Sequence, residues 1–212
     1  MAVINIKWSC CEDISIRDSA LNCGFNLSTL NISGLSEDKS KWIVDVVTKY
    51  ILDIIESSWE ENSSRIKFGD VKNGVYVISL GGNMCIGYEE GESQVLYIGQ
   101  GKIKSRLKSH LRNWIMHFSE SLQDMCLTFN MAKVVVKNSQ TPHEEVEADF
   151  IERFIDKFGE KPILNSIRGK NHNKYHEYDR RSLSPLHKKQ GISYGWRMSP
   201  MPKNDWFREI KN

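Results

Sequence analysis

Apolar residues follow two different spacings along the chain, and the difference predicts its strands and helices. Residues 73–80 and 95–99 are short runs rich in β-branched and aromatic residues, separated by glycine-containing turns at 81–83 and 91–93. Runs of this kind bounded by turn residues are typical of strands. We therefore expect an antiparallel hairpin with a long loop, and a third strand over residues 127–136.

Helical spacing appears first between Ser36 and about Glu61. Ser36 is a suitable N-cap, with Glu37 and Asp38 in the first turn. We interpret the apolar face of this helix as part of the core, with a partner-binding or dimer face as the alternative. That face comprises Trp42, Ile43, Val46, Val47, Tyr50, Ile51, Ile54, Ile55 and Trp59.

A second helix is predicted over residues 101–114, and it is strongly basic. Helical spacing places Arg106 and His110 together on one flank of its apolar stripe. That flank would face a site on the sheet, whereas a solvated basic helix is the alternative. The stripe consists of Ile103, Leu107, Leu111 and Trp114, and the other flank or the back carries Lys104, Lys108 and Arg112.

A third helix should begin at Thr141, where the sequence from Thr141 to Glu144 resembles a capping box with Pro142 at the first helical position. Gly159 should end it.

This third helix carries an acidic residue in an unusual position. Glu147 is at the centre of the apolar arc, and Glu152 is outside it. A carboxylate in an apolar stripe is costly unless a metal ion, a basic partner or a structural salt bridge compensates it. The arc is formed by Phe150, Ile151, Phe154 and Phe158.

The charges of the chain are unevenly distributed. Residues 166–212 hold 11 basic and 4 acidic side chains, a net charge of +7, whereas residues 1–72 and 73–165 are at −3 and −2. A basic segment of this kind suits a nucleic-acid partner, because Lys and Arg neutralise phosphates. A solvated basic tail is the alternative.

The cysteines and the hydropathy pattern bear on the compartment. The 5 cysteines show no CxxC spacing, so the sequence suggests neither a disulfide framework nor a zinc site. No basic leader followed by an apolar run is present, and no apolar run reaches the length of a membrane span. We expect a soluble, cytoplasmic protein without a membrane partner.

Several of these features occur together and in one order, and that order resembles the GIY-YIG nuclease family over residues 73–165. The pairing of Arg106 with His110 is similar to the restriction-enzyme branch of that family. Relative to the family, residues 81–94 form an insertion. The matching pieces are Gly74-Val75-Tyr76, Tyr97-Ile98-Gly99, Arg106 with His110, Glu147, and Pro162-Ile163-Leu164-Asn165.

The resemblance implies an α/β (α+β) fold with a small three-stranded antiparallel sheet flanked by helices. We expect this nuclease core over residues 73–165. A helical N-terminal extension would precede it over residues 1–72, and a basic C-terminal arm over residues 166–212 would contact DNA.

The resemblance also implies a Mg²⁺-dependent or Mn²⁺-dependent endonuclease. Glu147 would be the metal ligand, with Glu152 in reserve, because Mg²⁺ keeps several of its waters and tolerates one carboxylate. Arg106 would bind the scissile phosphate through its planar fork of donors.

The remaining matched residues would organise the attacking water. Tyr76 resembles the family's tyrosine that positions or deprotonates this water, and His110 or Lys102 would assist it. Tyr97 would hold a phosphate or the water network, and Asn165 would fix the local geometry.

These expectations define a function and its rivals. The first hypothesis is cleavage of double-stranded DNA, as in type II restriction, by a homodimer that cuts both strands. The alternatives are a repair or mobile-element nuclease, or a nucleic-acid-binding protein without catalysis. The expected DNA contacts are Lys102, Lys104, Lys108, Arg112, Arg168, Lys170, Lys174, Arg180 and Arg181.

Overall fold

The fold is built on one antiparallel sheet with helices on both faces. The computed structural model describes residues 3–27, 32–62, 66–116, 125–166, 176–187 and 195–198. The main sheet has the strand order β1-β6-β2-β5, and every neighbouring pair is antiparallel. The expected α+β class is confirmed. The strands are β1 (Ser9–Ser15), β2 (Gly74–Leu80), β5 (Val95–Gly101) and β6 (Cys126–Lys133).

The sheet has four strands rather than the three expected. The additional strand, β1, comes from the N-terminal region, and it pairs with β6 along its length. Its register shifts between Cys11 and Ile14, and Asp13 adopts a positive φ of 53°. This irregularity interrupts the period-2 alternation by which a strand is recognised in sequence. The strand was therefore missed.

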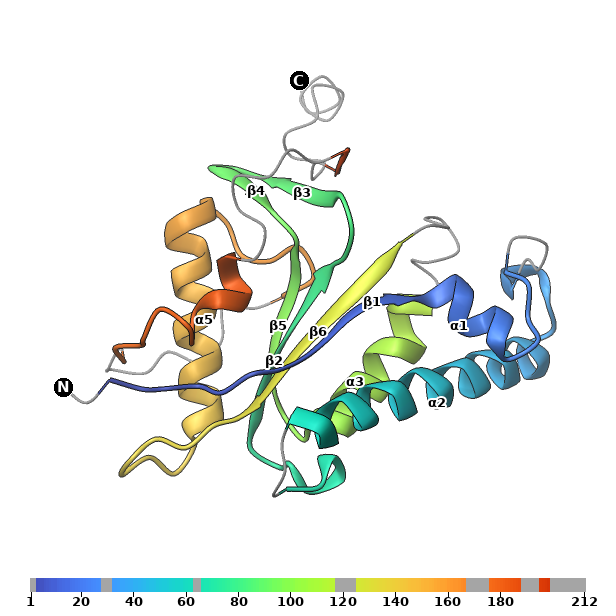
Figure 1. Ribbon diagram of the computed structural model, residues 1–212. Helices are drawn as coiled ribbons and strands as arrows, with labels where there is room; N and C mark the ends of the chain where they lie inside the picture. The colour runs from blue at the N-terminus through green and yellow to red at the C-terminus, as the bar shows by residue number, and fades with distance from the viewer. Residues whose placement is uncertain are drawn as a thin grey trace.

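Residues 81–94, the insertion between the two tyrosine-bearing strands, are mostly strand. They form β3 (Met84–Tyr88) and β4 (Gly91–Ser93), and β3 also pairs in parallel with β7 (Trp196–Met198). The Tyr88 hydroxyl donates to the Val95 carbonyl at 2.6 Å, and the Tyr88 ring packs edge-on against Phe154. The insertion thus supplies two strands of a small second sheet, which lies beside β5 and α5 (Figure 1).

Helices cover both faces of the main sheet. Figure 1 shows α2 and α3 on one side of the sheet and α5 on the other. None of the helices in the described segments is long and apolar enough to cross a membrane. The helices are α1 (Ile16–Asn22), α2 (Glu37–Asn62), α3 (Ile103–His110), which continues into the π-helical turn η3 (Leu111–Ile115), and α5 (Pro142–Phe158), with short 3₁₀ turns η1 (Ile32–Gly34), η2 (Phe68–Asp70) and η4 (Ser184–His187).

Helix α2 matches its predicted bounds within about one residue, but its buried face is narrower than predicted. Ile43, Val47 and Ile55 are buried, whereas Trp42 is 59% and Ile54 is 36% exposed. A buried stripe spans only about 100° of a helix. Trp42 and Ile54 therefore fall outside the part of α2 that meets the sheet.

Helix α5 begins and ends where the sequence predicts, but it is not capped as predicted. Gly159 ends it in the left-handed conformation, at φ 79°. At the other end the hydroxyl of Thr141 makes no capping bond, and only its carbonyl accepts from the Glu144 N–H, at 3.0 Å. The side chain that contacts the first turn of α5 is instead Ser139, whose hydroxyl donates to the Glu145 carboxylate at 2.6 Å.

Buried residues from all three sequence regions belong to one hydrophobic cluster. Ile14 comes from the N-terminal region, Val77 from the centre of the main sheet, and Leu186 from the C-terminal region. Residues near the N-terminus and residues of the segment 176–187 therefore share one core with the sheet.

Candidate active site

Two tyrosines on neighbouring strands form the floor of the candidate site. Tyr76 on β2 is 0% exposed, and Tyr97 on β5 is half-buried. Their rings stack with centroids 6.0 Å apart and an interplanar angle of 26°. Gly99 is the register partner of Tyr76, and a Cβ atom there would overlap the Tyr76 hydroxyl and the Tyr97 ring. The glycine of the second triplet is therefore what lets the Tyr76 ring lie across β5.

His110 links this floor to helix α3. Its Nε2 atom lies 2.8 Å from the Tyr76 hydroxyl, and the indole N–H of Trp114 donates to its Nδ1 atom at 2.9 Å. An indole nitrogen can only donate, so Nδ1 must accept. A neutral imidazole then carries its proton on Nε2 and donates it to the Tyr76 oxygen.

The surroundings keep both partners of this hydrogen bond neutral. Burial, with the nearby charge of Arg106, lowers the pKa of His110 to about 4. Burial raises the pKa of the Tyr76 phenol, and the neighbouring Tyr97 and Glu147 add to that rise, whereas Arg106 opposes it. At neutral pH the pair is therefore an imidazole that donates to a phenol.

Arg106 lies at the outer side of the two phenols. The side chain is exposed, and its guanidinium donates to the Tyr97 hydroxyl at 3.3 Å. Hydrogen bonding to Tyr76 and Tyr97 raises the pKa of Arg106, although burial opposes the rise. A permanent cation is thus held against two hydroxyl groups at a solvent-facing position.

Glu147 approaches the same cluster from α5. Its helix face buries Phe150 and Ile151, and the Glu147 side chain itself is half-buried. Its negative charge is close enough to raise the pKa of Tyr76. This electrostatic link favours Glu147 over the reserve residue Glu152, which is also half-buried.

Asn165 holds the edge of the sheet beside the tyrosines. It is 5% exposed, its Oδ1 atom accepts from the Ile98 N–H at 2.9 Å, and its Nδ2 atom donates to the Ile98 carbonyl at 2.8 Å. The side-chain amide therefore acts as a strand partner for edge strand β5, between Tyr97 and Gly99.

The expected DNA contacts separate into groups. Lys104 pairs with Glu56 at 2.7 Å and Arg112 with Asp45 at 2.6 Å, so both are engaged with α2. Lys102 and Lys108 are exposed and lie near Arg106 in the sequence. Arg180 and Arg181 are exposed in residues 176–187, which we call the C-terminal segment. Arg168, Lys170 and Lys174 lie outside the described residues.

Two functional contributions were not anticipated from the sequence. Trp114 was assigned to the apolar stripe of its helix, yet its indole N–H fixes the tautomer of His110. The spacing of His110 and Trp114, one helical turn apart, was the available signal.

Asp149, fully buried on α5, accepts from the Tyr178 hydroxyl at 2.7 Å and the His176 N–H at 3.0 Å. Asp149 thereby ties the C-terminal segment to α5.

Glu147 is the carboxylate of this cluster that could hold a divalent cation. Among the described residues, no group of three or more His, Cys, Asp and Glu side chains lies close enough together to hold a metal ion. Mg²⁺ is commonly held through one or two carboxylates together with substrate phosphates and waters, so a single carboxylate beside an arginine fits it.

Searches against protein-family models, curated proteins and solved structures returned no match for the chain.

Proposed function

We propose that this protein is a Mg²⁺-dependent endonuclease of the GIY-YIG type that hydrolyses phosphodiester bonds in double-stranded DNA. The observation that carries the proposal is the chain of hydrogen bonds from Trp114 through His110 to Tyr76, with the Arg106 cation and the Glu147 carboxylate beside it. Phosphodiester hydrolysis needs groups that neutralise charge, position water and hold the phosphate. These side chains supply them.

Arg106 binds the scissile phosphate in this mechanism. Its fork of N–H donors matches two phosphoryl oxygens, and its charge opposes the negative charge that develops on them. Because the guanidinium already bonds to the hydroxyl of Tyr97, its orientation is set before substrate arrives.

Tyr76 acts as a positioned phenol. His110 and Arg106 both direct N–H groups at its oxygen, which leaves the phenolic proton available for a phosphoryl oxygen or the attacking water. His110 cannot also accept that proton on Nε2 while Trp114 occupies Nδ1. The hydrogen bonds thus favour a positioning role for His110 over that of a base.

Glu147 is the residue that would hold the divalent cation. A bound Mg²⁺ would polarise a phosphoryl oxygen and lower the pKa of a coordinated water. Glu147 lies on α5 and Arg106 lies on α3. The phosphate would therefore be held between the Glu147 carboxylate and the Arg106 guanidinium.

The partner we infer is double-stranded DNA, cut at a fixed site by a homodimer whose two subunits each cleave one strand. Lys102 and Lys108, both exposed, would contact phosphates beside the site. None of the 5 cysteines takes part in a disulfide, and we propose a reducing compartment such as the cytoplasm.

Supercoiled plasmid provides the direct test. Incubation with Mg²⁺ should yield nicked and then linear DNA, and EDTA should prevent both. Sequencing of the cut ends would show one short sequence if the enzyme is of the restriction type. Ends at branches or lesions would instead indicate a repair nuclease. Absence of cleavage with Mg²⁺ and with Mn²⁺ would contradict the proposal.

One observation favours a second candidate, nucleic-acid binding without cleavage. Tyr76 is 0% exposed, so its side chain is covered in the free protein. A binding protein would show salt-sensitive DNA affinity with no product under any divalent cation. Loss of DNA affinity in Lys102→Ala and Lys108→Ala, without any cleavage by the wild type, would support this candidate.

A further inference from the structure

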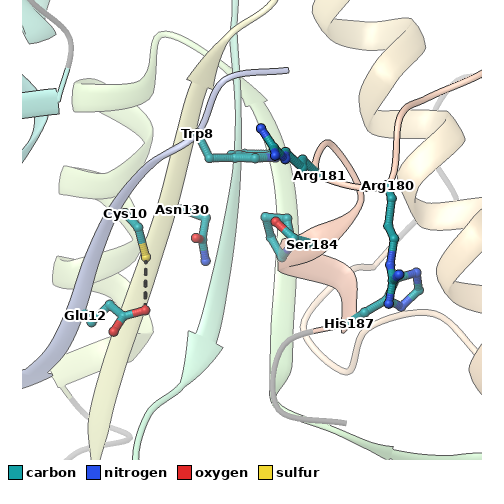
Figure 2. A pocket seen from close by; sticks show the side chains of 9 residues that line it. Trp8, Cys10, Glu12, Asn130, Arg180, Arg181, Ser184 and His187 are labelled. Carbon is teal, nitrogen blue, oxygen red and sulfur yellow. Dashed lines mark hydrogen bonds between the residues drawn. The ribbon is translucent and has the colours of Figure 1, made fainter. Parts of the chain in front are cut away.

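A cavity lies on the α5 side of the main sheet, away from the tyrosine cluster. Its volume is ≈ 700 Å³, within the range of small-molecule sites. Figure 2 shows Trp8 and Asn130 on the sheet side of this space and Arg180, Arg181, Ser184 and His187 on the side of the C-terminal segment.

The register of the sheet separates this cavity from the Tyr76 side chain. Asn130 is paired with Cys10 on one side and with Val77 on the other. Paired residues of an antiparallel sheet share a face, and successive residues of a strand point to opposite faces. Asn130 therefore projects from the face opposite to Tyr76, which precedes Val77.

The wall of the cavity is held in place by contacts between residues 4–8 and the C-terminal segment. The indole N–H of Trp8 donates to the Ser182 carbonyl at 2.9 Å, and the Ile6 N–H donates to the Ser182 hydroxyl at 2.7 Å. Ile4 forms a parallel bridge with Tyr178. Arg180 and Arg181 lie between Tyr178 and Ser182 in the sequence, so the backbone at both arginines is held in place.

Asn130 supplies the observation that points to a ligand. The residue is 5% exposed, and within the described structure its Nδ2 atom has no hydrogen-bond partner. A buried donor without an acceptor is costly, so such groups in folded proteins usually have a partner. An acceptor atom of an occupant of the cavity, which Asn130 lines, would satisfy this amide.

The other lining groups define the chemistry of that occupant. Arg180 and Arg181 are exposed cations suited to a phosphate, and half-buried Trp8 offers an aromatic surface suited to a planar ring. Glu12 also lines the cavity, and the Cys10 thiol donates to its carboxylate at 3.5 Å. A phosphate, a planar ring and hydrogen-bonding ring atoms together describe a nucleotide.

We propose that this cavity binds a nucleotide, with its phosphate on Arg180 and Arg181, its base against Trp8, and an acceptor atom of the base on Asn130. The proposal does not depend on the nuclease function, because none of the residues that line the cavity belongs to the candidate active site. The nucleotide is either a free monophosphate or one unit of a single strand, and the two sources are separable by experiment.

Calorimetric titration of the full chain in EDTA tests the proposal. The probes are the four deoxynucleoside 5′-monophosphates, inorganic phosphate, and tetranucleotides. Arg180→Ala and Arg181→Ala should each weaken binding by about tenfold, since each removes a charge-assisted hydrogen bond. Asn130→Leu should weaken it by a similar factor, while Lys39→Ala, an exposed charge on α2, should stay within about twofold.

Because both arginines are exposed, their variants test the cavity without a risk to folding. Monophosphates that bind and are weakened in these variants indicate a free nucleotide. Tetranucleotides that alone bind and are weakened in the same variants indicate a strand. The proposal is overturned if neither probe binds the folded protein at millimolar concentration, or if binding is unchanged in Arg181→Ala and in Asn130→Leu.

Discussion

The two faces of the main sheet carry polar groups in contrasting states. On the α3 face, Tyr76 and both ring nitrogens of His110 have hydrogen-bond partners within the protein. On the α5 face, the amide nitrogen of Asn130 has none among the described residues. A satisfied cluster is organised before substrate binds, which suits catalysis, whereas an unsatisfied donor suits the capture of a ligand.

The largest expected effect is the loss of plasmid cleavage when Arg106, on the α3 side of the sheet, is replaced. Arg106→Ala should lower plasmid cleavage by about 10²–10³-fold, because it removes the proposed donor to the phosphoryl oxygens. Arg106→Lys should recover little of this, since an ammonium group lacks the planar fork. Nucleotide binding at the Asn130 cavity should change by less than about twofold. Equal losses of both activities would show that the two faces form one site.

The second effect is a pH dependence of stability that originates in the α3 face. His110 has a pKa of about 4 in the folded protein, whereas the unfolded chain protonates near about 6.5. Its contribution is therefore fully present above pH about 6.5 and is lost as the pH falls toward 4. The slope for one proton is at most about 1.4 kcal/mol per pH unit, and partial exposure of His110 reduces it.

Urea unfolding of the wild type and of His110→Gln between pH 4 and 8 measures this slope. The difference in unfolding free energy between the two proteins should shrink as the pH falls below about 6.5. His187, whose pKa is also lowered, contributes equally to both proteins. A difference that does not vary with pH would mean that His110 is not held neutral.

The third effect concerns the close packing of the tyrosine pair. Gly99→Ala should destabilise the protein by about 1–3 kcal/mol, because the added methyl overlaps the rings of Tyr76 and Tyr97. Gly69→Ala is the matched control, since a Cβ atom at Gly69 meets nothing within 4 Å. Thermal unfolding of both variants measures the contrast. Equal stabilities would show that the tyrosines do not pack across β5.

The smallest effect tests which basic residues face DNA. Lys104 and Arg112 pair with α2, so Lys104→Ala and Arg112→Ala should each change stability by less than about 1 kcal/mol and leave the salt dependence of DNA binding unaltered. Lys102→Ala and Lys108→Ala should each reduce the salt slope by about 1. Filter binding across a range of salt concentrations measures the slopes. Equal slopes in all four variants would remove this distinction.

The sequence predicted the elements with regular periodicity and missed those that depend on tertiary contacts. Strand β2 was recognisable as a short run of β-branched and aromatic residues bounded by turn residues, and helices α2 and α5 by their continuous helical spacing. Strand β1 was not, since the irregularity at Asp13 breaks its alternation and only pairing with β6 reveals it.

The same distinction applies to the candidate sites. Tyr76, Tyr97, Arg106 and His110 were predicted together because the order of two glycine-containing triplets and an Arg–His pair resembles the GIY-YIG family. The Asn130 cavity had no such signal. It requires Trp8 and Arg181 to meet across almost the whole chain, through contacts such as the Trp8 bond to Ser182. No local pattern encodes that proximity.

The most direct test of the account is a paired measurement of plasmid cleavage by Glu147→Gln and Glu152→Gln in the presence of Mg²⁺. Both changes remove one negative charge from α5, but only Glu147 is electrostatically linked to Tyr76. We predict that Glu147→Gln loses cleavage by at least about 10²-fold, whereas Glu152→Gln cleaves like the wild type. Wild-type cleavage by Glu147→Gln would contradict the account.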